Sequence, residues 1–404
     1  MKLIYIADVR LPTEKAHGLE VMKLCEAFAK VGMDVELVVP EIFFNPIKKD
    51  PFEFYRTGKV FKIKKFFAID LLFLSARGGY ASGGGFLRQS FFLLRVLSFS
   101  FFAAFYFLFL KLAGKLADVV FFSHDHLALY FVSFLGAPVV FDIHDFVSGN
   151  IFYKRIIKKS RCFSVQTKWK IKELNRLYGI EESKIAYWPN GVEIKEFSLP
   201  IDKKEARLKL DLPLNEKIIL YLGHFFSWKG ADVLALASSY FNEDTVAYFV
   251  GGTKEDAERF KIFISENNLR QTKLISFQPH EKVPYWLKSA DVLVLPNTAK
   301  EDISKFYTSP MKLFEYMASE RPIVASNIPS IAEILNDFST SSEQANAVLV
   351  APDNPEDLVR GVNFVLNNRE IAEKLAKQAC LDVQKYTWVG RAMRIKKLLE
   401  KTVV

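Results

Sequence analysis

KIILYLGHFFSWKGADVL, residues 217–234, leads from an apolar run through a glycine-containing turn into a helical pattern. The apolar run ends at Gly223, and Lys229 and Gly230 stand where the helical pattern begins. Buried parallel strands are apolar on both faces and alternate with helices, so this stretch predicts one strand-turn-helix step of a parallel sheet. Doubly wound sheets bind ligands at the carboxyl ends of their strands. A cation and a tight turn at that edge are therefore a candidate pyrophosphate site.

The same alternation of short apolar runs and helical patterns continues on both sides of this stretch. Such an alternation is typical of parallel sheets covered by helices, so we expect an α/β chain of two Rossmann-like, doubly wound domains. The strand candidates are KLIYIAD, DVELVVP, DVVFFS, PVVFDIH and RCFSVQT in the first half, and KIILYLG, VAYFVGG, TKLISF, DVLVLP, RPIVAS and NAVLVAP in the second.

The boundary between the two domains is predicted to follow the Pro-Asn-Gly sequence at 189–191. This sequence ends the last strand-like run of the first half, and a charged helical pattern, KKEARLKL, opens the next domain. We therefore assign residues 1–195 to a first domain and residues 196–380 to a second. The final helical pattern, YTWVGRAMRIKKLLEK, belongs to residues 381–404 and is expected to cross back to the first domain.

The cysteine content of the chain favours a reducing compartment. Three cysteines without a CxxC pair suggest neither a disulfide framework nor a zinc site, and the start, MKLIYIADVR, is typical of a strand rather than an export signal. We therefore expect a cytoplasmic protein.

The positive charge lies in the first half of the chain. Residues 1–195 hold 28 Lys and Arg against 18 Asp and Glu, whereas residues 196–404 hold 27 Lys and Arg against 28 Asp and Glu. The excess either keeps the protein soluble or attracts an anionic membrane surface. We expect no nucleic acid as a partner, because no nucleic-acid-binding motif accompanies the charge.

A phenylalanine-rich stretch occupies residues 86–113 of a chain that holds 38 Phe. Between Arg95 and Lys111 it has 15 uncharged residues, fewer than the ~20 that span a bilayer core. Two interpretations remain open, namely a long helix buried in the protein and a helix lying in the bilayer interface with its cations towards lipid phosphates. The basic, aromatic segment at 55–67 supports the second. SARGGYASGGGF, residues 75–86, is predicted to be a mobile loop.

SPMKLFEYMASERPIVAS, residues 309–326, predicts a helix that begins at an anion site and leads into a buried strand. Ser309 is expected to cap this helix, ahead of a proline at its first position. The amides of Met311 and Lys312 then lack helical partners, and with the helix dipole they form a seat for phosphate. Glu315 lies on the same helical face, where its carboxylate can accept two hydroxyl hydrogen bonds from a ribose.

Other candidate residues follow predicted strands at their carboxyl edges. His224 follows the strand that ends at Gly223, and His144 follows PVVFDI. A structural histidine with satisfied hydrogen bonds is the alternative for His144. Gly18 is predicted in the first strand-to-helix turn, where an anion or sugar can approach the backbone closely. That turn lacks the GxGxxG pattern, so a nicotinamide cofactor is not supported.

A metal site is not expected. His124 and His126 stand two residues apart in SHDH, but such a pair at a strand end usually has one ring turned inward and the other outward. The chain also has no Asp-x-Asp (DxD) motif.

Taken together, these motifs resemble the retaining family 4 glycosyltransferases of GT-B fold. The resemblance covers nearly the whole chain and is strongest from Tyr221 to Leu335, where LGHFFSWKG, SPMKLFEYMASERPIVAS and IPSIAEIL follow the family's order and spacing. It implies two domains facing each other across a cleft, a nucleotide-diphosphate sugar on the second and a lipid-linked or glycan acceptor on the first. It also implies that no metal or other cofactor is needed. Together with the basic, Phe-rich first half, it suggests an enzyme of surface-polysaccharide or glycolipid assembly, associated peripherally with the inner face of the cell membrane.

The resemblance also implies roles for single residues. Lys229 would neutralise the pyrophosphate, Glu315 would bind the ribose, and His144 would be the active-site histidine near the transferred sugar. These three are the expected catalytic residues. The expected donor-binding residues are Gly18, His224, Lys229, Ser309, Met311, Lys312 and Glu315.

Two departures from the family pattern leave alternatives open. Tyr307 stands where the family has the first of two glutamates, so the usual contact to the sugar hydroxyls is in doubt. His224 stands where an arginine is common, and a histidine of ordinary pKa would weaken phosphate binding as the pH rises through the sevens. A sugar-nucleotide hydrolase or epimerase of the same fold, and a non-catalytic relative that binds membranes or glycans, are the alternative functions.

Overall fold

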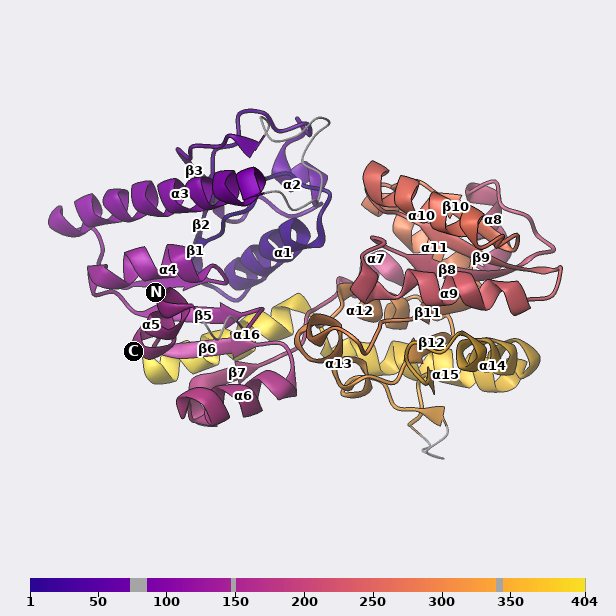
Figure 1. Ribbon diagram of the computed structural model, residues 1–404. Coiled ribbons are helices and arrows are strands. Elements are labelled where there is room, and N and C mark those ends of the chain that lie inside the picture. The colour runs from indigo at the N-terminus through magenta and orange to yellow at the C-terminus, as the bar shows by residue number, and fades with distance from the viewer. Residues whose placement is uncertain (73–85, 147–149, 339–343, 404) are drawn as a thin grey trace. The chain divides into compact units, whose positions relative to one another are not determined.

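The computed structural model describes residues 1–72, 86–146, 150–338 and 344–403. These residues form two compact units, drawn as ribbons in Figure 1. Unit 1 consists of Met1–Pro189 together with the segment that begins at Trp388, and unit 2 consists of Asn190–Thr387. The sequence places the boundary near residue 195 and the start of the returning segment at 381, whereas the structural units change at Asn190 and Trp388.

Unit 1 is built on a seven-stranded parallel sheet in the order β3-β2-β1-β4-β5-β6-β7. Apart from the edge strand β3, its strands are buried over most of their length, as the continuous apolar runs of the sequence predict. The strands are β1 (Lys2–Ile6), β2 (Asp34–Pro40), β3 (Lys62–Phe66), β4 (Val119–Ser123), β5 (Val139–Ile143), β6 (Cys162–Val165) and β7 (Ile185–Tyr187).

Helices cover both faces of this sheet. The helices α3 to α6 pack on one face, while α1 and α16 pack against each other on the other face. Their bounds, with the short α2, are α1 (Ala16–Lys30), α2 (Pro51–Phe54), α3 (Phe86–Leu112), α4 (His126–Val132), α5 (Ile151–Lys159), α6 (Lys168–Tyr178) and α16 (Trp388–Thr402).

Helix α3 uses one of its faces to build the core of unit 1. Phe99, Ala103 and Phe107, spaced four residues apart, are buried, and the ring of Phe107 lies 5.0 Å from that of Phe121 in β4. Among the described residues α3 is the one helix long and apolar enough to cross a membrane, judged by length and composition alone, and 33% of its most apolar window is buried. The predicted loop before it, residues 75–86, lies outside the described residues except for Phe86.

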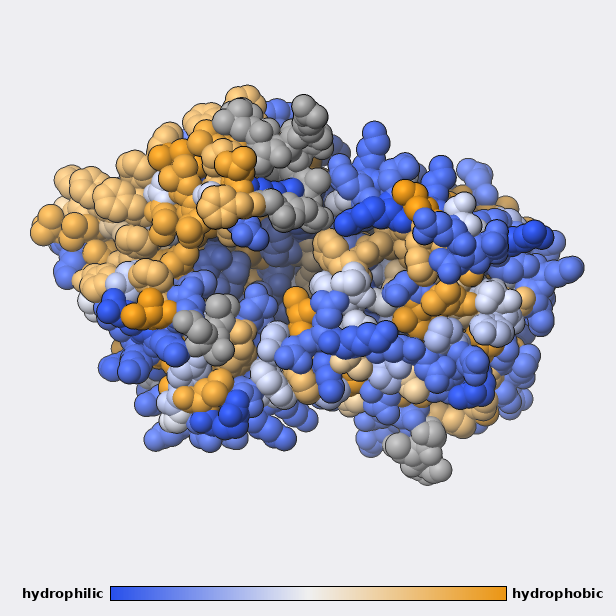
Figure 2. Space-filling view, viewed as in Figure 1, coloured by the Kyte–Doolittle hydropathy of each residue, from blue (hydrophilic) through white to orange (hydrophobic). Residues whose placement is uncertain are grey.

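The opposite face of α3 carries a second row of phenylalanines. Phe101, Phe105 and Phe109, again four residues apart, are 53%, 62% and 65% exposed. Figure 2 shows hydrophobic side chains gathered over this helix. Exposed apolar patches of this kind mark interaction surfaces in soluble proteins.

Unit 2 repeats the scheme with a six-stranded parallel sheet in the order β10-β9-β8-β11-β12-β13. The two faces of this sheet carry separate hydrophobic clusters under the covering helices. The strands are β8 (Lys217–Leu222), β9 (Thr245–Val250), β10 (Thr272–Ile275), β11 (Val292–Leu295), β12 (Ile323–Ser326) and β13 (Val348–Val350). The helices are α7 (Ile194–Phe197), α8 (Lys203–Lys209), α9 (Ala231–Ala237), α10 (Lys254–Glu266), α11 (Val283–Ser289), α12 (Met311–Ala318), α13 (Pro329–Ala332), α14 (Pro355–Asn367) and α15 (Arg369–Asp382).

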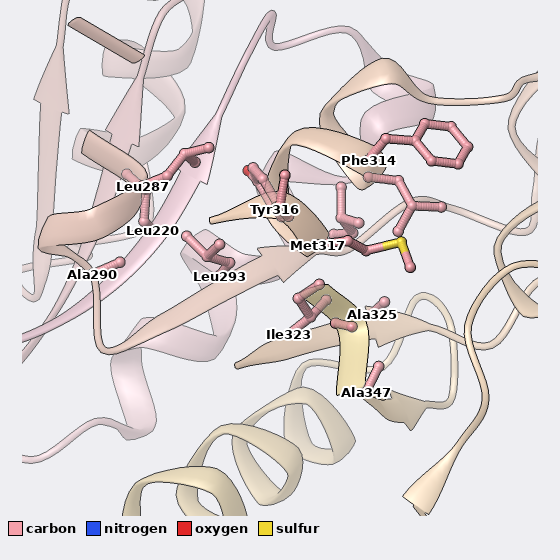
Figure 3. Packing of buried hydrophobic residues seen from close by; sticks show 14 of the residues in the cluster. Leu220, Leu287, Ala290, Leu293, Phe314, Tyr316, Met317, Ile323, Ala325 and Ala347 are labelled. Carbon is pink, nitrogen blue, oxygen red and sulfur yellow. The ribbon is translucent and has the colours of Figure 1, made fainter. Parts of the chain in front are cut away.

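One of these clusters anchors α12 to the sheet. Phe314 and Met317 of α12 are buried, and they belong to the same cluster as Leu220, Leu293 and Ile323 from three neighbouring strands (Figure 3). Burying a side chain of this size contributes about 1.5–3 kcal/mol. The packing therefore holds the first turn of α12 in a defined place.

The predicted doubly wound architecture is confirmed, and all eleven predicted strands have a counterpart. Two edge strands, β3 and β7, are not among the eleven strand candidates. β3 lies inside the basic segment at 55–67, and its Lys64 packs over the ring of Tyr106 in α3, with the amine 3.8 Å from the ring centre. Part of that basic segment therefore belongs to the fold itself.

Candidate functional site

In unit 2, a tyrosine fixes α12 against the carboxyl end of β8. The hydroxyl of Tyr316 accepts a hydrogen bond of 3.0 Å from the backbone N–H of Leu222, and Tyr316 is fully buried. This contact brings Lys312, a predicted site residue, to the glycine that follows the strand, Gly223.

The amine of Lys312 lies directly over that strand end. Its Nζ lies 4.0 Å from the centre of the Tyr221 ring, and a Cβ built on Gly223 would lie 3.0 Å from the same Nζ. Gly223 adopts a φ of 141°, which also favours glycine. Among the described residues this buried amine has no hydrogen-bond partner. Burial, together with the charge of Lys229, lowers the pKa of Lys312 well below its usual value.

Lys229 joins the cluster from the turn that follows β8. It ends a short 3-10 helix, Ser227–Lys229, and Gly230 then takes a left-handed conformation at φ 66°. A Cβ on Gly230 would lie 1.8 Å from the carbonyl oxygen of Pro296, so only glycine fits there. Burial lowers the pKa of Lys229 to about 8, against the opposing effects of Asp256 and Glu315.

Glu315 is the carboxylate of this cluster. Burial raises its pKa to about 7, with a contribution from Glu196, although Lys312 and Lys229 both act to lower it. The three side chains therefore interact electrostatically. A buried amine without a partner is costly, so this arrangement is suited to an anionic ligand that would pair with it.

His224 lies in the same loop, but its predicted titration near neutral pH is wrong. Burial lowers the pKa of His224 to about 4, and the charge of Lys229 adds to the effect, although Asp256 opposes it from 3.5 Å. The ring also stacks on Phe226, with 5.1 Å between the ring centres. A neutral imidazole can donate or accept a hydrogen bond, but it adds no charge near pH 7.

The start of α12 differs from its predicted form. Ser309 does not cap the helix, because its Oγ accepts a hydrogen bond from the backbone N–H of Asn190 and its carbonyl accepts one from the Asn190 amide. Pro310 instead occupies the N-cap position. The first bond of the helix runs from the N–H of Leu313 to the Pro310 carbonyl, so the amides of Met311 and Lys312 precede it. The predicted pair of helix-start amides is thus retained.

Tyr307 lies immediately before this helix start. It ends a short π-helix, Ile303–Tyr307, and is half-buried. A single π-helical turn is frequent at functional sites. A phenol in this position offers one hydroxyl group where the family resemblance implies a carboxylate.

In unit 1, His144 belongs to a network of charged residues below the carboxyl end of β5. Its Nε2 lies 3.0 Å from Asp142 Oδ2 and 3.5 Å from Glu20 Oε1. Burial acts to lower the pKa of His144, but these two carboxylates outweigh it and raise the pKa above the usual value. His144 therefore has strong structural partners, and its side chain is 28% exposed.

Arg391 of α16 completes this network and is not among the residues predicted from the sequence. Its guanidinium donates a hydrogen bond of 2.8 Å to Glu20 and two bonds, of 2.9 and 3.0 Å, to Asp142. The spacing of Trp388, Arg391 and Ile395, which puts an arginine on the apolar face of the last helix, was the available signal. Glu20, Asp142 and His144 hold ligand atoms within 4.8 Å of one another, as a metal site would, but both carboxylates are bonded to this guanidinium.

Two other predicted features of unit 1 have structural partners. Gly18 lies inside the first turn of α1 rather than in the turn before it, and a Cβ there would lie 2.2 Å from the Tyr55 hydroxyl. Close packing is thus sufficient to require the glycine. His124 and His126 are both half-buried, so the predicted division into one inward and one outward ring is not seen. The first contacts the Tyr5 hydroxyl and the second the side chain of Asn150.

Comparison with known families gives two matches that together span most of the chain. Residues 202–381 match the model of "Glycosyl transferases group 1", and residues 21–196 match that of "Glycosyltransferase Family 4". An uncharacterized glycosyltransferase of Methanocaldococcus jannaschii is 25% identical over 54% of this chain and 54% of its own length. The putative colanic acid biosynthesis glycosyl transferase WcaI of Escherichia coli is 26% identical over 46% and 45%. The chain spans about half the length of the curated relatives it matches.

Solved structures of similar fold cover the whole chain. The HepE protein of Anabaena, crystallised with UDP and glucose, has a TM-score of 0.73 at 15% identity and covers 99% of both chains. Sucrose-phosphate synthase of Thermosynechococcus elongatus has a TM-score of 0.72 at 19% identity, again with 99% of both chains. WaaG, a glycosyltransferase involved in lipopolysaccharide biosynthesis, has a TM-score of 0.66 at 15% identity and covers 100% of both. These likenesses show a shared fold.

Proposed function

Because the chain belongs to the GT-B glycosyltransferases of the family 4 type, we propose that it transfers a sugar from a nucleotide-diphosphate sugar to an acceptor. The observation that carries the proposal is the cluster at the end of β8, where the unpartnered amine of Lys312 and the amine of Lys229 interact electrostatically with the carboxyl group of Glu315. A nucleoside diphosphate combines two negative phosphates with a ribose diol, and this cluster has a group for each.

The same residues supply the chemistry of the transfer step. Cleavage of the anomeric bond places negative charge on the departing diphosphate, so ammonium groups and amides already in position stabilise the transition state more than the ground state. In this proposal Lys229, Lys312 and the amide of Met311 stabilise the leaving group, and Glu315 holds the ribose. Ser309, which bonds to Asn190, positions the helix start rather than the ligand.

We further propose that the transfer retains the anomeric configuration and uses no metal ion. The sequence lacks the DxD carboxylate pair that would bind a metal-diphosphate complex. No carboxylate of the cluster is assigned the role of nucleophile, since Glu315 is assigned to the ribose. Front-face departure and attack, assisted by the diphosphate itself, fits these groups. His144, the histidine of unit 1, is the proposed contact to the transferred sugar.

The proposed acceptor is lipid-linked or a growing glycan, met by unit 1 at the cytoplasmic face of a membrane. The excess of positive charge lies in residues 1–195, and the exposed row of phenylalanines on α3 lies in the same unit. Basic residues with exposed aromatic rings favour the interface of an anionic bilayer. Relatives named for colanic acid biosynthesis and lipopolysaccharide biosynthesis are consistent with such an acceptor.

A panel of nucleotide sugars tests the proposal. A ligand that binds only the folded protein raises its melting temperature, so one member of the panel should do so in the wild type and fail to do so in Lys312→Met and Lys229→Met. Lys261→Met, at an exposed position of α10, is the matched control. Retention is checked by the anomeric configuration of the product.

Two alternative functions have distinct outcomes in the same experiments. Turnover of the nucleotide sugar without an acceptor, to a free or epimerised sugar, would favour a hydrolase or epimerase. The absence of any nucleotide binding would favour a non-catalytic relative. Tyr307, which replaces the expected glutamate, is the observation that favours the non-catalytic alternative.

A further inference from the structure

Unit 1 contains a cavity of about 490 Å³ that lies outside the site residues described so far. It opens where the chain leaves β1, between the segment leading to α1 and the first turns of α3. The residues of its wall that carry the argument are Asp8, Arg10, Lys15, Arg88, Phe92 and Arg95.

The wall of this cavity is strongly basic. Four of the six residues named above are cationic and one is acidic. His17 also lines the cavity, but burial lowers its pKa to about 4, helped by His124 and Lys15, so it contributes no charge near pH 7. An anion is therefore the ligand that this wall favours.

Two of the guanidinium groups are held in place by ion pairs. Arg95 donates a hydrogen bond of 2.9 Å to Oδ2 of Asp8, and Arg10 donates to Glu14 and Thr13. Both arginines are buried. A guanidinium has five N–H donors, so one that bonds to a carboxylate oxygen can also bond to an oxygen of a ligand. Fixed guanidinium groups suit the planar, two-pronged recognition of phosphate.

Asp8 adds a hydrogen-bond acceptor to the cations of this wall. Its side chain is 2% exposed, and its Oδ1 has no hydrogen-bond partner among the described residues, although Oδ2 is bonded to Arg95. Burial raises the pKa of this carboxyl group, against the effect of Arg95 and with a contribution from Asp125. A buried acceptor without a donor is costly, and a ligand hydroxyl would supply the missing hydrogen bond.

We infer that this cavity binds the phosphate of a phosphate-bearing, hydroxylated acceptor, with its cations on the phosphate and Asp8 on a neighbouring hydroxyl. The inference rests on the proposed function, because it names the acceptor chemistry for the same transfer. The ligand is either a soluble sugar phosphate or the headgroup of a lipid that carries a phosphate and free hydroxyls. The lipid source would place its chain along α3, where Leu93, Leu94 and Leu97 follow the cavity residues and are exposed.

Two probes distinguish the sources. The full-length protein is titrated with three soluble probes: glucose 6-phosphate, inorganic phosphate and glucose. It is titrated separately with two kinds of phosphatidylcholine vesicle, one containing phosphatidylinositol and the other the same fraction of phosphatidylserine. A soluble acceptor predicts that glucose 6-phosphate binds more tightly than either phosphate or glucose. A lipid acceptor predicts stronger binding to phosphatidylinositol vesicles than to phosphatidylserine vesicles, since only the former headgroup has a ring of hydroxyls.

The variants then assign the binding to the cavity. Lys15→Gln with Arg88→Gln leaves the Arg95–Asp8 pair intact and should weaken binding of the preferred probe at least tenfold, while the cooperative unfolding transition is retained. Lys172→Gln, at an exposed position of α6, is the matched control. Asp8→Asn, of equal size, replaces a charged acceptor by a neutral amide and should reduce the preference for the hydroxylated probe, while binding of inorganic phosphate persists.

Two results would overturn the inference. One is binding of the preferred probe that is equal in the wild type and the double variant, and the other is the absence of a preference for either hydroxylated probe. Nucleotide-sugar binding, followed by the melting temperature, is measured in parallel and depends on the lysines of unit 2. If nucleotide sugars bind and no phosphate probe does, only the inference fails, whereas phosphate binding without nucleotide binding would contradict the proposed function.

Discussion

At the scale of single residues, Arg391 has the most demanding environment in unit 1. It is fully buried and bridges Glu20 and Asp142, so its removal would take a fixed positive charge away from two buried carboxylates. We expect Arg391→Met to lower the free energy of unfolding by about 3–5 kcal/mol, as measured by urea denaturation. Arg394→Met, at an exposed position of the same helix, should change it by less than about 0.5 kcal/mol. Equal stabilities for the two variants would contradict the role given to Arg391.

The pKa values of the unit 2 cluster predict how nucleotide affinity depends on pH. The pKa of Glu315 is raised to about 7, so the carboxylate proposed to accept ribose hydroxyls forms as the pH rises through 7. The pKa of Lys229 is lowered to about 8, so the ammonium proposed to pair with phosphate is lost as the pH rises through 8. Affinity for the nucleotide, measured by calorimetry, should therefore be highest between these values. In Glu315→Gln the decline on the acid side should disappear, and its persistence would count against the assignment.

Much of this site could be predicted from residue types and their place after a strand. Lys229, Lys312 and Glu315 come together because the turn after β8 and the first turn of α12 both belong to the ligand-binding edge of one sheet. The neutral state of His224 could not be predicted, because it depends on burial and on the charge of a lysine five residues further along the chain. The bond between Ser309 and Asn190 was hidden for a similar reason, since it joins residues 119 positions apart.

At the scale of elements, the two phenylalanine faces of α3 should respond differently to substitution. Phe107 is buried against the sheet, so Phe107→Ala should cost about 3–5 kcal/mol of stability. Phe105 is 62% exposed, so Phe105→Ser should change stability by less than about 0.5 kcal/mol. If α3 meets a membrane, the same exposed substitution should weaken binding to anionic vesicles about tenfold in a flotation assay. Unchanged vesicle binding would contradict a role of the exposed phenylalanine row in membrane binding.

The elements that could be predicted are those whose burial imposes a continuous apolar run. β2, DVELVVP, and β4, within DVVFFS, belong to the interior of the sheet and have this signature. β3, with the sequence KIKKF, and the three-residue β7 form the two edges, where one side has no neighbouring strand. Such strands are short or carry lysines, so their sequences are typical of surface segments. The same ambiguity made the basic segment at 55–67 a candidate membrane contact.

At the scale of the whole molecule, the last helix, α16, belongs to unit 1 together with residues Met1–Pro189. α16 packs against α1 and supplies Arg391, Ile395 and Leu399 to the interior of unit 1. A chain that ends at Thr387 should therefore lose the unfolding transition of unit 1, while unit 2 retains its own transition and is still stabilised by the nucleotide. Differential scanning calorimetry with and without nucleotide checks this. Loss of nucleotide binding in the truncated protein would show that unit 2 depends on α16.

The chain enters and leaves unit 2 at neighbouring points. Val192 pairs with Thr387 in an isolated parallel bridge, and its N–H donates a hydrogen bond of 3.0 Å to the carbonyl of Tyr386. In topological terms unit 2 is a continuous insert, whose two ends are held together by its own backbone. Exchanging this insert for the corresponding part of another family member would require only two adjacent splice joints. A chimera of this kind could inherit its donor preference from one parent and its acceptor preference from the other.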